Sequence, residues 1–226
     1  MTLVLKVGGA SAAGAVQQVA AEAASGRPLV VVHGGGPQIS ALMRERGLEP
    51  QYLDGRRITD ADALACVDEG LRAVNAALCA DLQAAGLAAR GLPGGVVQAR
   101  RTPGLGLVGE PSGADIAHVV EMLALGELPV IGPLAREAGG SALLNVNADD
   151  AAAALAGALG ADELVFLTDV PGVLDADGAL IRELRASTPP ASASGGMLPK
   201  LEACAAALAA GVSRVWIGRE GTLVRA

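Results

Sequence analysis

The chain has 226 residues, enough for one large α/β domain or for two lobes that share a sheet. Its net charge of −7 argues against a nucleic-acid-binding class, because no basic excess is available to replace phosphate counterions. The three cysteines lack metal-ligand spacing, which is typical of thiols in a reducing compartment. The sequence opens directly into an apolar segment and contains no apolar run of membrane-spanning length. We therefore expect a cytoplasmic protein without a signal peptide or membrane contact.

Apolar strand-like runs alternate with helix-like segments along the whole chain. We therefore expect an α/β fold, a three-layer α-β-α sandwich with a mainly parallel open sheet, in a single domain over residues 1–226. In chain order the sequence predicts strands at 3–7 and 29–32 separated by a helix at 12–25, helices at 38–45 and 60–85, a strand at 87–92, and a hairpin formed by 96–101 and 107–110. It then predicts a helix at 114–125, a strand at 128–131, an alanine-rich helix ending at 159, a strand at 163–167, a polar lip at 175–194, a helix at 197–210, and strands at 213–217 and 222–224.

The long helix predicted over 60–85 has Thr59 or Asp60 as its candidate N-cap. An apolar stripe with helical spacing runs along it, formed by Leu64, Val67, Leu71, Val74, Leu78 and Leu82. Such a stripe fits a core face and fits equally well a seam between the helices of two subunits. Both interpretations remain open from the sequence alone.

A buried strand, a bare loop and a helix follow one another from Leu29 to Ser40, where the sequence is LVVVHGGGPQIS. The glycines at 34–36 give a loop whose amide hydrogens can approach an anion closely. Pro37 suits the first turn of the following helix, whose N-terminus favours negative charge. This pattern indicates an anion cradle, and a tight turn with packing glycines is the alternative. The spacings of a Walker loop and of a GxGxxG dinucleotide loop are absent.

Only two lysines occur among the seventeen basic residues, and each lies near a glycine pair. An ammonium is a compact charge that can follow a moving phosphate, although chance could also leave two lysines at these positions. Because ligands of parallel sheets bind beyond the carboxyl ends of the strands, the lysines can converge there with other polar residues. The candidate set is Lys6, Gly8, Gly9, Gly34, Gly35, Gly36, Arg57, Asn145, Asn147, Asp149, Asp169 and Lys200.

This candidate set is rich in cations and glycines and poor in carboxylates. It contains no Ser-His-Asp arrangement, and the two histidines, His33 and His118, are too scattered for a metal site. Such a set suits the stabilisation of spread negative charge, which phosphoryl transfer requires. The sequence therefore favours a phosphoryl-transfer site without protein ligands for a metal.

Several members of the set also have a plain structural interpretation. Asp149 can be only the N-cap of the helix that follows it, and Asp169 can serve only turn chemistry. Asn145 and Asn147 alternate, so we expect both on one face of a strand, where two amides can simply pair with a turn. Arg57, which follows another arginine, can be part of a solvated pair. The sequence leaves these alternatives open.

Six motifs punctuate the chain from its first strand to its last long helix. They are Lys-Val-Gly-Gly at 6–9, Val-His-Gly-Gly-Gly-Pro-Gln-Ile at 32–39, Gly-Arg-Arg-Ile-Thr at 55–59, Asn-Val-Asn-Ala-Asp at 145–149, Leu-Thr-Asp-Val-Pro-Gly-Val-Leu at 167–174 and Gly-Gly-Met-Leu-Pro-Lys-Leu at 195–201. In this order they resemble the amino acid kinase family, and within it the branch that acts on N-acetyl-L-glutamate. Carbamate and uridylate kinases share the glycine loops but are not expected to combine Asn-x-Asn-x-Asp with Gly-Arg-x-x-Thr.

The resemblance implies that ATP phosphorylates the γ-carboxylate of N-acetyl-L-glutamate, the second step of arginine biosynthesis. It implies that Lys6 and Lys200 stabilise the transferring phosphoryl group and that Asp149 holds both lysines. Magnesium is expected to ride on the ATP phosphates, and no general base is needed because the acceptor is already a carboxylate. The resemblance assigns Gly35, Gly36, Arg57, Asn145 and Asn147 to the substrate, with Arg57 on its α-carboxylate, and Gly8, Gly9, Asp169, Val170, Pro171, Gly172, Val173 and Leu174 to the nucleotide.

The resemblance also implies two lobes and an assembly. An N-lobe of about 1–145 is expected to bind acetylglutamate and to form a homodimer through the helix at 60–85, and a C-lobe of about 146–226 is expected to bind ATP. Arginine-inhibited members carry an extra N-terminal helix, and this sequence starts at its first strand, so we expect a homodimer without arginine feedback. The alternatives are a kinase for aminoadipate or glutamate held on a carrier protein, and a non-catalytic ligand sensor on the same fold.

Overall fold

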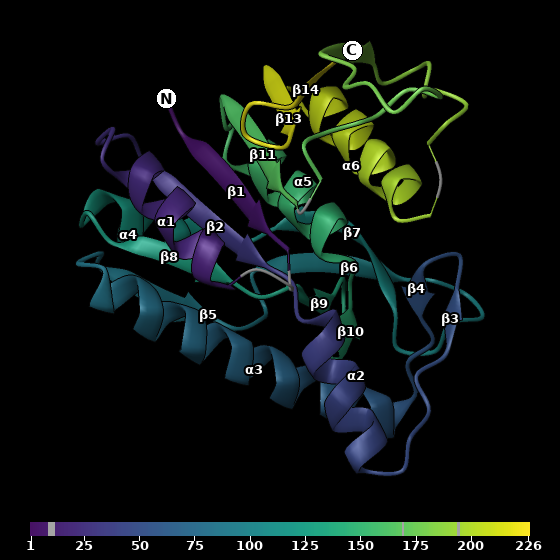
Figure 1. The fold of residues 1–226 in the computed structure, drawn as a ribbon. Coiled ribbons are helices and arrows are strands. Elements are labelled where there is room, and N and C mark those ends of the chain that lie inside the picture. Colours follow the sequence, from purple (N-terminus) through teal and green to yellow (C-terminus); the bar gives the residue numbers. More distant parts are fainter. Residues whose placement is uncertain (9–11, 169, 194) are drawn as a thin grey trace.

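The computed structural model describes residues 1–8, 12–168, 170–193 and 195–226 (Figure 1). Within these residues the main sheet has eight strands, in the order β12 (Glu183–Arg185), β14 (Thr222–Arg225), β13 (Arg214–Ile217), β11 (Glu163–Leu167), β1 (Leu3–Val7), β2 (Leu29–His33), β8 (Leu128–Ile131) and β5 (Ala89–Leu92). From β5 to β13 all neighbours are parallel, β14 is antiparallel to β13, and β12 runs parallel to β14 at the edge. The predicted mainly parallel sheet is confirmed.

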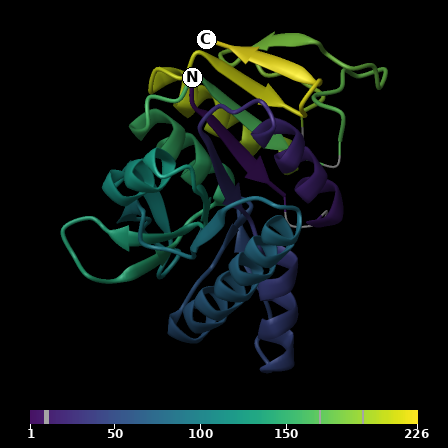
Figure 2. The same cartoon turned by 90° about the vertical axis from the view of Figure 1, so that its left-hand side faces the viewer.

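Helices cover both faces of this sheet (Figures 1 and 2). Leu5 of β1 packs with the helices of one face, and Val4 packs with the helices of the other. The first face is covered by α1 (Ala12–Ala23) and α3 (Ala61–Ala84), and the second by α4 (Ala117–Ala124), α5 (Ala148–Ala158) and α6 (Met197–Ala209). This arrangement confirms the three-layer α-β-α sandwich.

A smaller four-stranded sheet packs against α5. Its order is β10 (Leu143–Asn145), β9 (Leu134–Glu137), β6 (Val97–Arg101) and β7 (Gly109–Ala114), and β6 with β7 forms the predicted antiparallel hairpin. Next to it α2 (Gly36–Glu45) packs on α3, and Figure 2 shows these two helices side by side. A short hairpin of β3 (Tyr52–Leu53) and β4 (Arg56–Arg57) lies between α2 and α3 in the chain.

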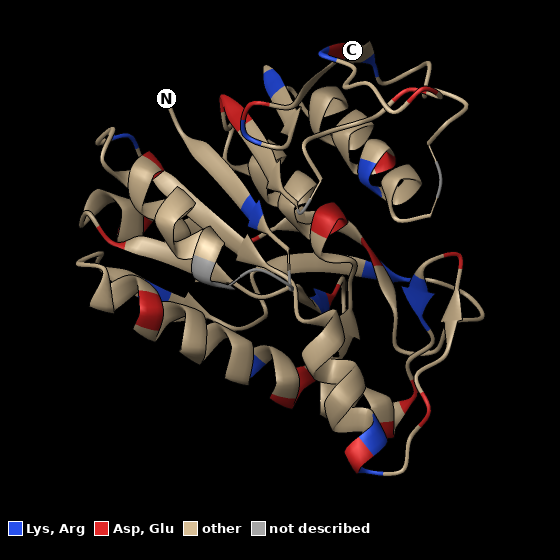
Figure 3. Cartoon of the chain, in the orientation of Figure 1, with Lys and Arg blue, Asp and Glu red and all other residues tan. Residues whose placement is uncertain are grey.

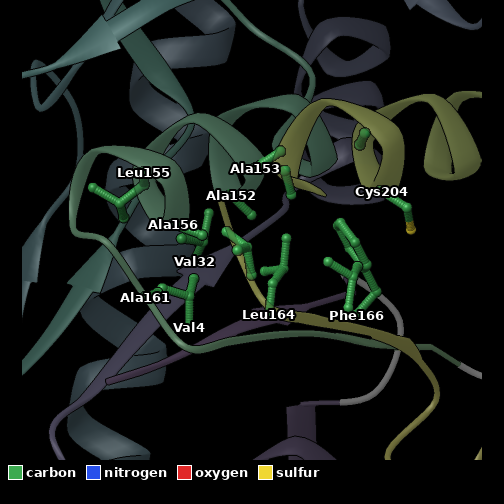
Figure 4. Close-up of a cluster of buried hydrophobic side chains, with 14 of the residues drawn as sticks. Val4, Val32, Ala152, Ala153, Leu155, Ala156, Ala161, Leu164, Phe166 and Cys204 are labelled. Carbon is green, nitrogen blue, oxygen red and sulfur yellow. The ribbon is translucent and has the colours of Figure 1, made fainter. Parts of the chain in front are cut away.

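Small side chains let α5 lie close to the sheet and to α6 (Figure 4). Ala152 and Ala156 of α5 are buried in the same cluster as Phe166 of β11. The two helices are so close that a Cβ on Gly157 would lie 2.5 Å from the Cβ of Ala210. Because protein interiors are densely packed, this contact leaves no room for a larger side chain where the C-terminal ends of α5 and α6 meet.

The long helix α3 begins at a cap from Asp60, whose carboxylate accepts a hydrogen bond from Ala63 N at 2.8 Å. Most of its apolar stripe is buried inside the chain, which confirms the core interpretation. The buried members are Val67, Leu71, Leu78 and Leu82, and the half-buried members are Leu64 and Val74.

Charged residues of both signs are spread along the chain (Figure 3), and the cysteines are buried. In the view of Figure 3 basic residues alternate with acidic ones and do not gather into one basic face. Cys66, Cys79 and Cys204 are buried free thiols. Along the described residues no helix combines the length and the apolar character needed to cross a bilayer.

Some segments differ from the sequence prediction. The helix expected over 114–125 begins only at Ala117, because β7 continues as a strand to Ala114. The sequence also missed β9, β12 and the β3–β4 hairpin. These strands are two to four residues long, and β12 buries only Leu184, so their apolar pattern is too short to recognise.

Candidate functional site

Lys6 lies on the face of β1 that points toward α5. Successive residues of a strand point to opposite faces. Leu5 and Val7 pack with the α1 and α3 layer, so Lys6 shares the other face with Val4. Its Nζ atom lies 2.8 Å from Oδ1 of Asp149, in the first turn of α5.

Lys200 reaches the same carboxylate from the first turn of α6. Its Nζ atom lies 2.8 Å from Oδ2 of Asp149 and 5.1 Å from the ring centroid of Phe166. Asp149 and Lys200 are only 7% and 8% exposed. One buried carboxylate therefore brings together two lysines from opposite ends of the chain, and we call these three residues the lysine bridge.

The carboxylate of the lysine bridge is held ionised. Burial alone would raise the pKa of Asp149, but the charges and hydrogen bonds of Lys6 and Lys200 outweigh burial and hold this pKa below its ordinary value. The N-terminus of α5 also favours negative charge at this position. The two ammonium groups are thus fixed in place beside a permanent anion.

The N-cap of α5 is Asn147 and not Asp149. The Oδ1 atom of Asn147 accepts a hydrogen bond from Asp149 N at 2.7 Å, and its backbone is extended, with φ −61° and ψ 134°. Asn145 is the last residue of β10. The interpretation of Asp149 as only a cap is therefore wrong, and so is the expectation that both asparagines lie on one strand.

A cavity of about 230 Å³, which we call the acceptor cavity, opens beside Lys6. The predicted substrate residues Gly35, Gly36, Arg57, Asn145 and Asn147 all line it. A Cβ on Gly35 would lie 3.1 Å from the side chain of Leu71, whereas a Cβ on Gly36 would meet open space. Among the described residues no Asp or Glu lines this cavity, so it suits an anion.

Arg57 is a buried cation of the acceptor cavity, 7% exposed. Its guanidinium donates to Ser40 Oγ at 2.8 Å and to Gly36 O at 3.2 Å, and it lies 4.8 Å from the ring centroid of Tyr52. Burial lowers the pKa of Arg57 from its ordinary value, and no described Asp or Glu forms a salt bridge with it. A buried cation in these surroundings favours an anionic ligand, and the interpretation as a solvated pair is wrong.

Asn145 is tied to the same segment through a buried threonine. Its Nδ2 atom donates to Thr59 Oγ1 at 3.1 Å, and Thr59 Oγ1 donates to the carbonyl oxygen of Arg57 at 2.7 Å. Thr59 is completely buried. The chain of hydrogen bonds holds the asparagine and the arginine at fixed positions beside the cavity.

A second, larger cavity of about 1020 Å³ is also lined by Lys6, and we call it the donor cavity. Asp149, Gly195 and Gly196 line it together with the first turn of α6. The residues that line both cavities are Lys6, Gly55, Arg56 and Asn147. Lys6 of the lysine bridge therefore lies where the two cavities meet, and Asp149 lines the donor cavity.

His33 supports the glycine loop from inside the core. Asn75 Nδ2 donates to His33 Nε2 at 3.0 Å and to Val130 O at 2.9 Å, and His33 Nδ1 donates to Gly34 O at 2.8 Å. Burial lowers the pKa of His33, which keeps the ring neutral as this pattern requires. The histidine is a structural support of the loop.

The predicted nucleotide residues are not brought together in one cavity. Gly9 and Asp169 lie outside the described residues. Gly8 lines an apolar groove of about 510 Å³ between α2 and α3. In the remaining stretch Val173 is buried and its N donates to Thr222 Oγ1 at 2.8 Å, while Val170 and Leu174 are exposed. Pro171 and Gly172 complete the stretch 170–174, and the φ angle of Gly172 is 157°.

Sequence reasoning missed the residues that hold Arg57, namely Ser40, Tyr52 and Thr59. The available signals are that Thr59 ends the Gly-Arg-Arg-Ile-Thr motif and that Ser40 follows Gly36 by one turn in α2, which places Ser40 beside the loop. Within the described part of the chain no group of three His, Cys, Asp or Glu side chains could hold an ion.

Comparisons with known proteins bear on this site. The model of the amino acid kinase family matches residues 1–219. The acetylglutamate kinase of Koribacter versatilis (strain Ellin345) is 42% identical, covering 96% of this chain and 90% of that protein.

Two solved structures are similar over the whole chain. The structure of smu.665 from Streptococcus mutans UA159 has a TM-score of 0.91 at 32% identity, covering 99% of this chain and 98% of that one. N-acetylglutamate synthase from Neisseria gonorrhoeae, complexed with coenzyme A and N-acetyl-glutamate, has a TM-score of 0.84 at 25% identity and covers 100% of this chain but 59% of that one.

Proposed function

The chain belongs to the amino acid kinase family, and from that premise we propose that it is an acetylglutamate kinase. The reaction transfers the γ-phosphoryl group of ATP to the side-chain carboxylate of N-acetyl-L-glutamate, as the name of the relative at 42% identity supports. The observation that carries the proposal is the lysine bridge, a pair of ammonium groups on one buried carboxylate, of which Lys6 lines both cavities.

In the proposed reaction an oxygen of the acceptor carboxylate attacks the γ-phosphorus. A new oxygen–phosphorus bond forms, the bond to the β,γ-bridging oxygen breaks, and ADP leaves. Charge spreads over the transferring group, and Lys6 with Lys200 stabilises it from both sides of Asp149. A side-chain carboxylic acid has a pKa of about 4.3, so the acceptor is ionised at neutral pH and no general base is required.

The acceptor would lie in the smaller cavity, within the N-lobe. Arg57 would pair with the α-carboxylate, because its fork of donors matches a planar anion. Gly35 and Gly36 would offer backbone amides at the start of α2, and Asn145 and Asn147 would hold the remaining polar atoms of the substrate. The lack of acidic lining residues in the described part of this cavity supports an acylated rather than a free amine.

The end of the nucleotide that carries the transferring phosphoryl group would lie at the larger cavity, beside Lys6 and Asp149, although none of the described residues that we assign to the nucleotide lines that cavity. We assign the phosphates to Gly8 and Gly9 and the nucleotide to residues 169–174, by likeness to the family motifs. Gly195 and Gly196, before α6, supply further backbone donors beside Lys200. Magnesium neutralises phosphate charge when it is bound, and phosphate oxygens with water can hold it without protein ligands.

We further propose a homodimer through α3 and a cytoplasmic location. The exposed side of α3 carries small residues such as Ala65, Ala76 and Ala80, which allow close approach of a second helix. The three buried free thiols suit a reducing compartment. Sedimentation of the purified chain tests the dimer, and a monomer at micromolar concentration contradicts it.

The direct test of the activity is ADP release with acetylglutamate, glutamate and aminoadipate as separate acceptors. The proposal predicts turnover with acetylglutamate and an acyl phosphate that hydroxylamine can trap. Turnover with glutamate or aminoadipate but not with acetylglutamate contradicts the assigned acceptor. The likeness to the N-acetylglutamate synthase structure keeps one alternative, a ligand sensor. Binding of acetylglutamate without ADP release would favour that alternative.

A further inference from the structure

The β3–β4 hairpin that carries Arg57 has little intrinsic stability. Each strand has two residues, and an isolated hairpin is marginally stable even when it is longer. Tyr52 and Leu53 are each 53% exposed, and the turn holds Asp54 at a φ of 49°. The position of the hairpin over the acceptor cavity therefore depends on contacts with other elements.

Arg56 supplies two such contacts. Because residues alternate along a strand, Arg56 points away from the buried side that Arg57 occupies. Its Nη1 atom lies 3.2 Å from Oε1 of Glu110 on β7, and its Nη2 atom lies 3.5 Å from Oδ2 of Asp150 on α5. Asp150 directly follows Asp149, so Arg56 connects the hairpin to the helix turn that holds the lysine bridge.

We propose that Arg56 is a positioning residue, which holds the β3–β4 hairpin over the acceptor cavity by pairing with Asp150 and Glu110 and so keeps Arg57 oriented toward the substrate. Its place supports this role, because it lines both the acceptor and the donor cavity. Loss of the pairing loosens Arg57 and weakens acceptor binding. The lysine bridge is untouched, so transfer from the bound state continues at about its normal rate.

The surroundings of Asp150 make this contact sensitive to pH. Burial raises the pKa of Asp150 to about 6. The positive charge of Arg56 offsets this rise only in part, and the neighbouring carboxylates add to it. Below that pH the carboxyl group becomes neutral and its attraction for the guanidinium weakens. The charged groups that face Asp150 are Arg56 from β4, Glu110 from β7, Glu202 from α6 and Asp149 from its own helix.

The kinetic part of this inference rests on the proposed acetylglutamate kinase activity, whereas the fixation of the hairpin does not. The first experiment therefore measures hydrogen–deuterium exchange in residues 52–58 without any substrate. We expect the Arg56→Met variant to exchange about fivefold faster there than the wild type, on the scale of two lost, partly exposed charge pairs. Arg90→Met is the matched control. Arg90 lies on β5, far from residues 52–58 in the sequence, and forms an exposed salt bridge with Glu127.

The second experiment compares the KM for acetylglutamate with kcat and with the KM for ATP. In Arg56→Met the acceptor KM should rise about fivefold to tenfold, while kcat and the ATP KM stay within about twofold. In the wild type the acceptor KM should rise as pH falls from 8 to 5, with a midpoint near pH 6. The Asp150→Asn variant, which keeps an uncharged oxygen acceptor for Arg56, should lose that midpoint.

The outcomes separate the two proposals. Wild-type exchange rates in Arg56→Met would overturn the role of Arg56 whether or not the chain phosphorylates acetylglutamate. Faster exchange with an unchanged acceptor KM would also overturn it, because the hairpin would then not position Arg57. A midpoint that persists in Asp150→Asn contradicts the part assigned to Asp150. A wild type that neither binds nor phosphorylates acetylglutamate contradicts the proposed function, and the exchange measurement still decides on Arg56.

Discussion

Lys200 and Asp149 lie 51 positions apart in the sequence, yet the Nζ atom of one is 2.8 Å from the Oδ2 atom of the other. The second oxygen of the same carboxylate lies 2.8 Å from Lys6 on the central strand. Two ammonium groups that both lie beside one carboxylate would repel each other if that shared anion were absent. Asp149 therefore permits a local concentration of positive charge, which a transferring phosphoryl group requires.

Replacement of either lysine should impair transfer far more than folding. We expect Lys6→Met or Lys200→Met to lower kcat by about 10²–10³, the scale for losing one charge-stabilising donor. Steady-state ADP release at saturating substrates measures this. The exposed Arg90→Met variant serves as the control for loss of a positive charge. Full turnover in both lysine variants would mean that their roles are misassigned.

Asp149→Asn should impair both activity and stability. The change leaves two buried ammonium groups without their anion, which costs about 3 kcal/mol of unfolding free energy. Because the folded-state pKa of Asp149 is depressed, its contribution is present above the ordinary value of 3.8 and is lost as pH falls below it. Urea denaturation should therefore show a gap between wild type and variant at pH 7 that narrows below pH 4. An equal gap at both pH values contradicts the ion-pair origin.

Arg57→Met should weaken binding of the acceptor and not of ATP. A charged hydrogen bond contributes about 1.5–3 kcal/mol, so the KM for acetylglutamate should rise about tenfold to a hundredfold. Arg57→Lys should not restore it, because an ammonium cannot replace the planar fork held by Ser40 and Gly36. If the KM for ATP rises as much as the KM for acetylglutamate, the assignment of Arg57 to the acceptor is contradicted.

Asp150→Asn should stabilise the folded protein at pH 8. The pKa of Asp150 is raised from 3.8 to about 6, so ionisation opposes folding and its cost grows as pH rises through this interval. At about 1.36 kcal/mol per unit, two units correspond to at most about 3 kcal/mol. Thermal unfolding should show a higher Tm for the variant at pH 8 and a smaller difference at pH 4. A lower Tm at pH 8 contradicts the buried, destabilising carboxylate.

Two glycine substitutions test the buried support of the glycine loop. A Cβ on Gly91 would lie 2.0 Å from Oδ1 of Asn75, whose amide holds His33. Gly91→Ala should therefore lower stability by about 1–3 kcal/mol, the cost of leaving buried polar groups unpaired. Gly14→Ala is the matched control, because a Cβ at Gly14 meets nothing within 4 Å. This substitution lies in α1 and should raise the free energy of unfolding by about 0.5–1 kcal/mol. Chemical denaturation of both variants should show opposite signs.

The sequence predicted the lysine bridge better than its surroundings. Lys6 and Lys200 were recognisable because lysine is rare in this chain and because each follows or precedes glycines at the end of an element. Ser40, Tyr52 and Thr59 were not, since each acts through a contact with Arg57 or Asn145 that depends on how distant elements pack. Single-residue patterns carry no information on such contacts.

The run Asn-Val-Asn-Ala-Asp shows where local rules conflict. Alternation predicted a strand through Asn147, whereas the preference for helix caps allowed Asp149 to start α5. The structure ends β10 at Asn145 and starts the helix after Asn147, because burial of the alanines of α5 fixes the helix register. That register places Asp149 between the lysines, a tertiary result that neither local rule contains.

The claim that both lysines act on one transferring group is tested most directly by a crystal structure with ADP, magnesium, acetylglutamate and aluminium fluoride as a mimic of the phosphoryl group in flight. We expect the mimic where the two cavities meet, within hydrogen-bond distance of the Nζ atoms of both Lys6 and Lys200. A mimic that lies beyond hydrogen-bond distance of either lysine would contradict this claim.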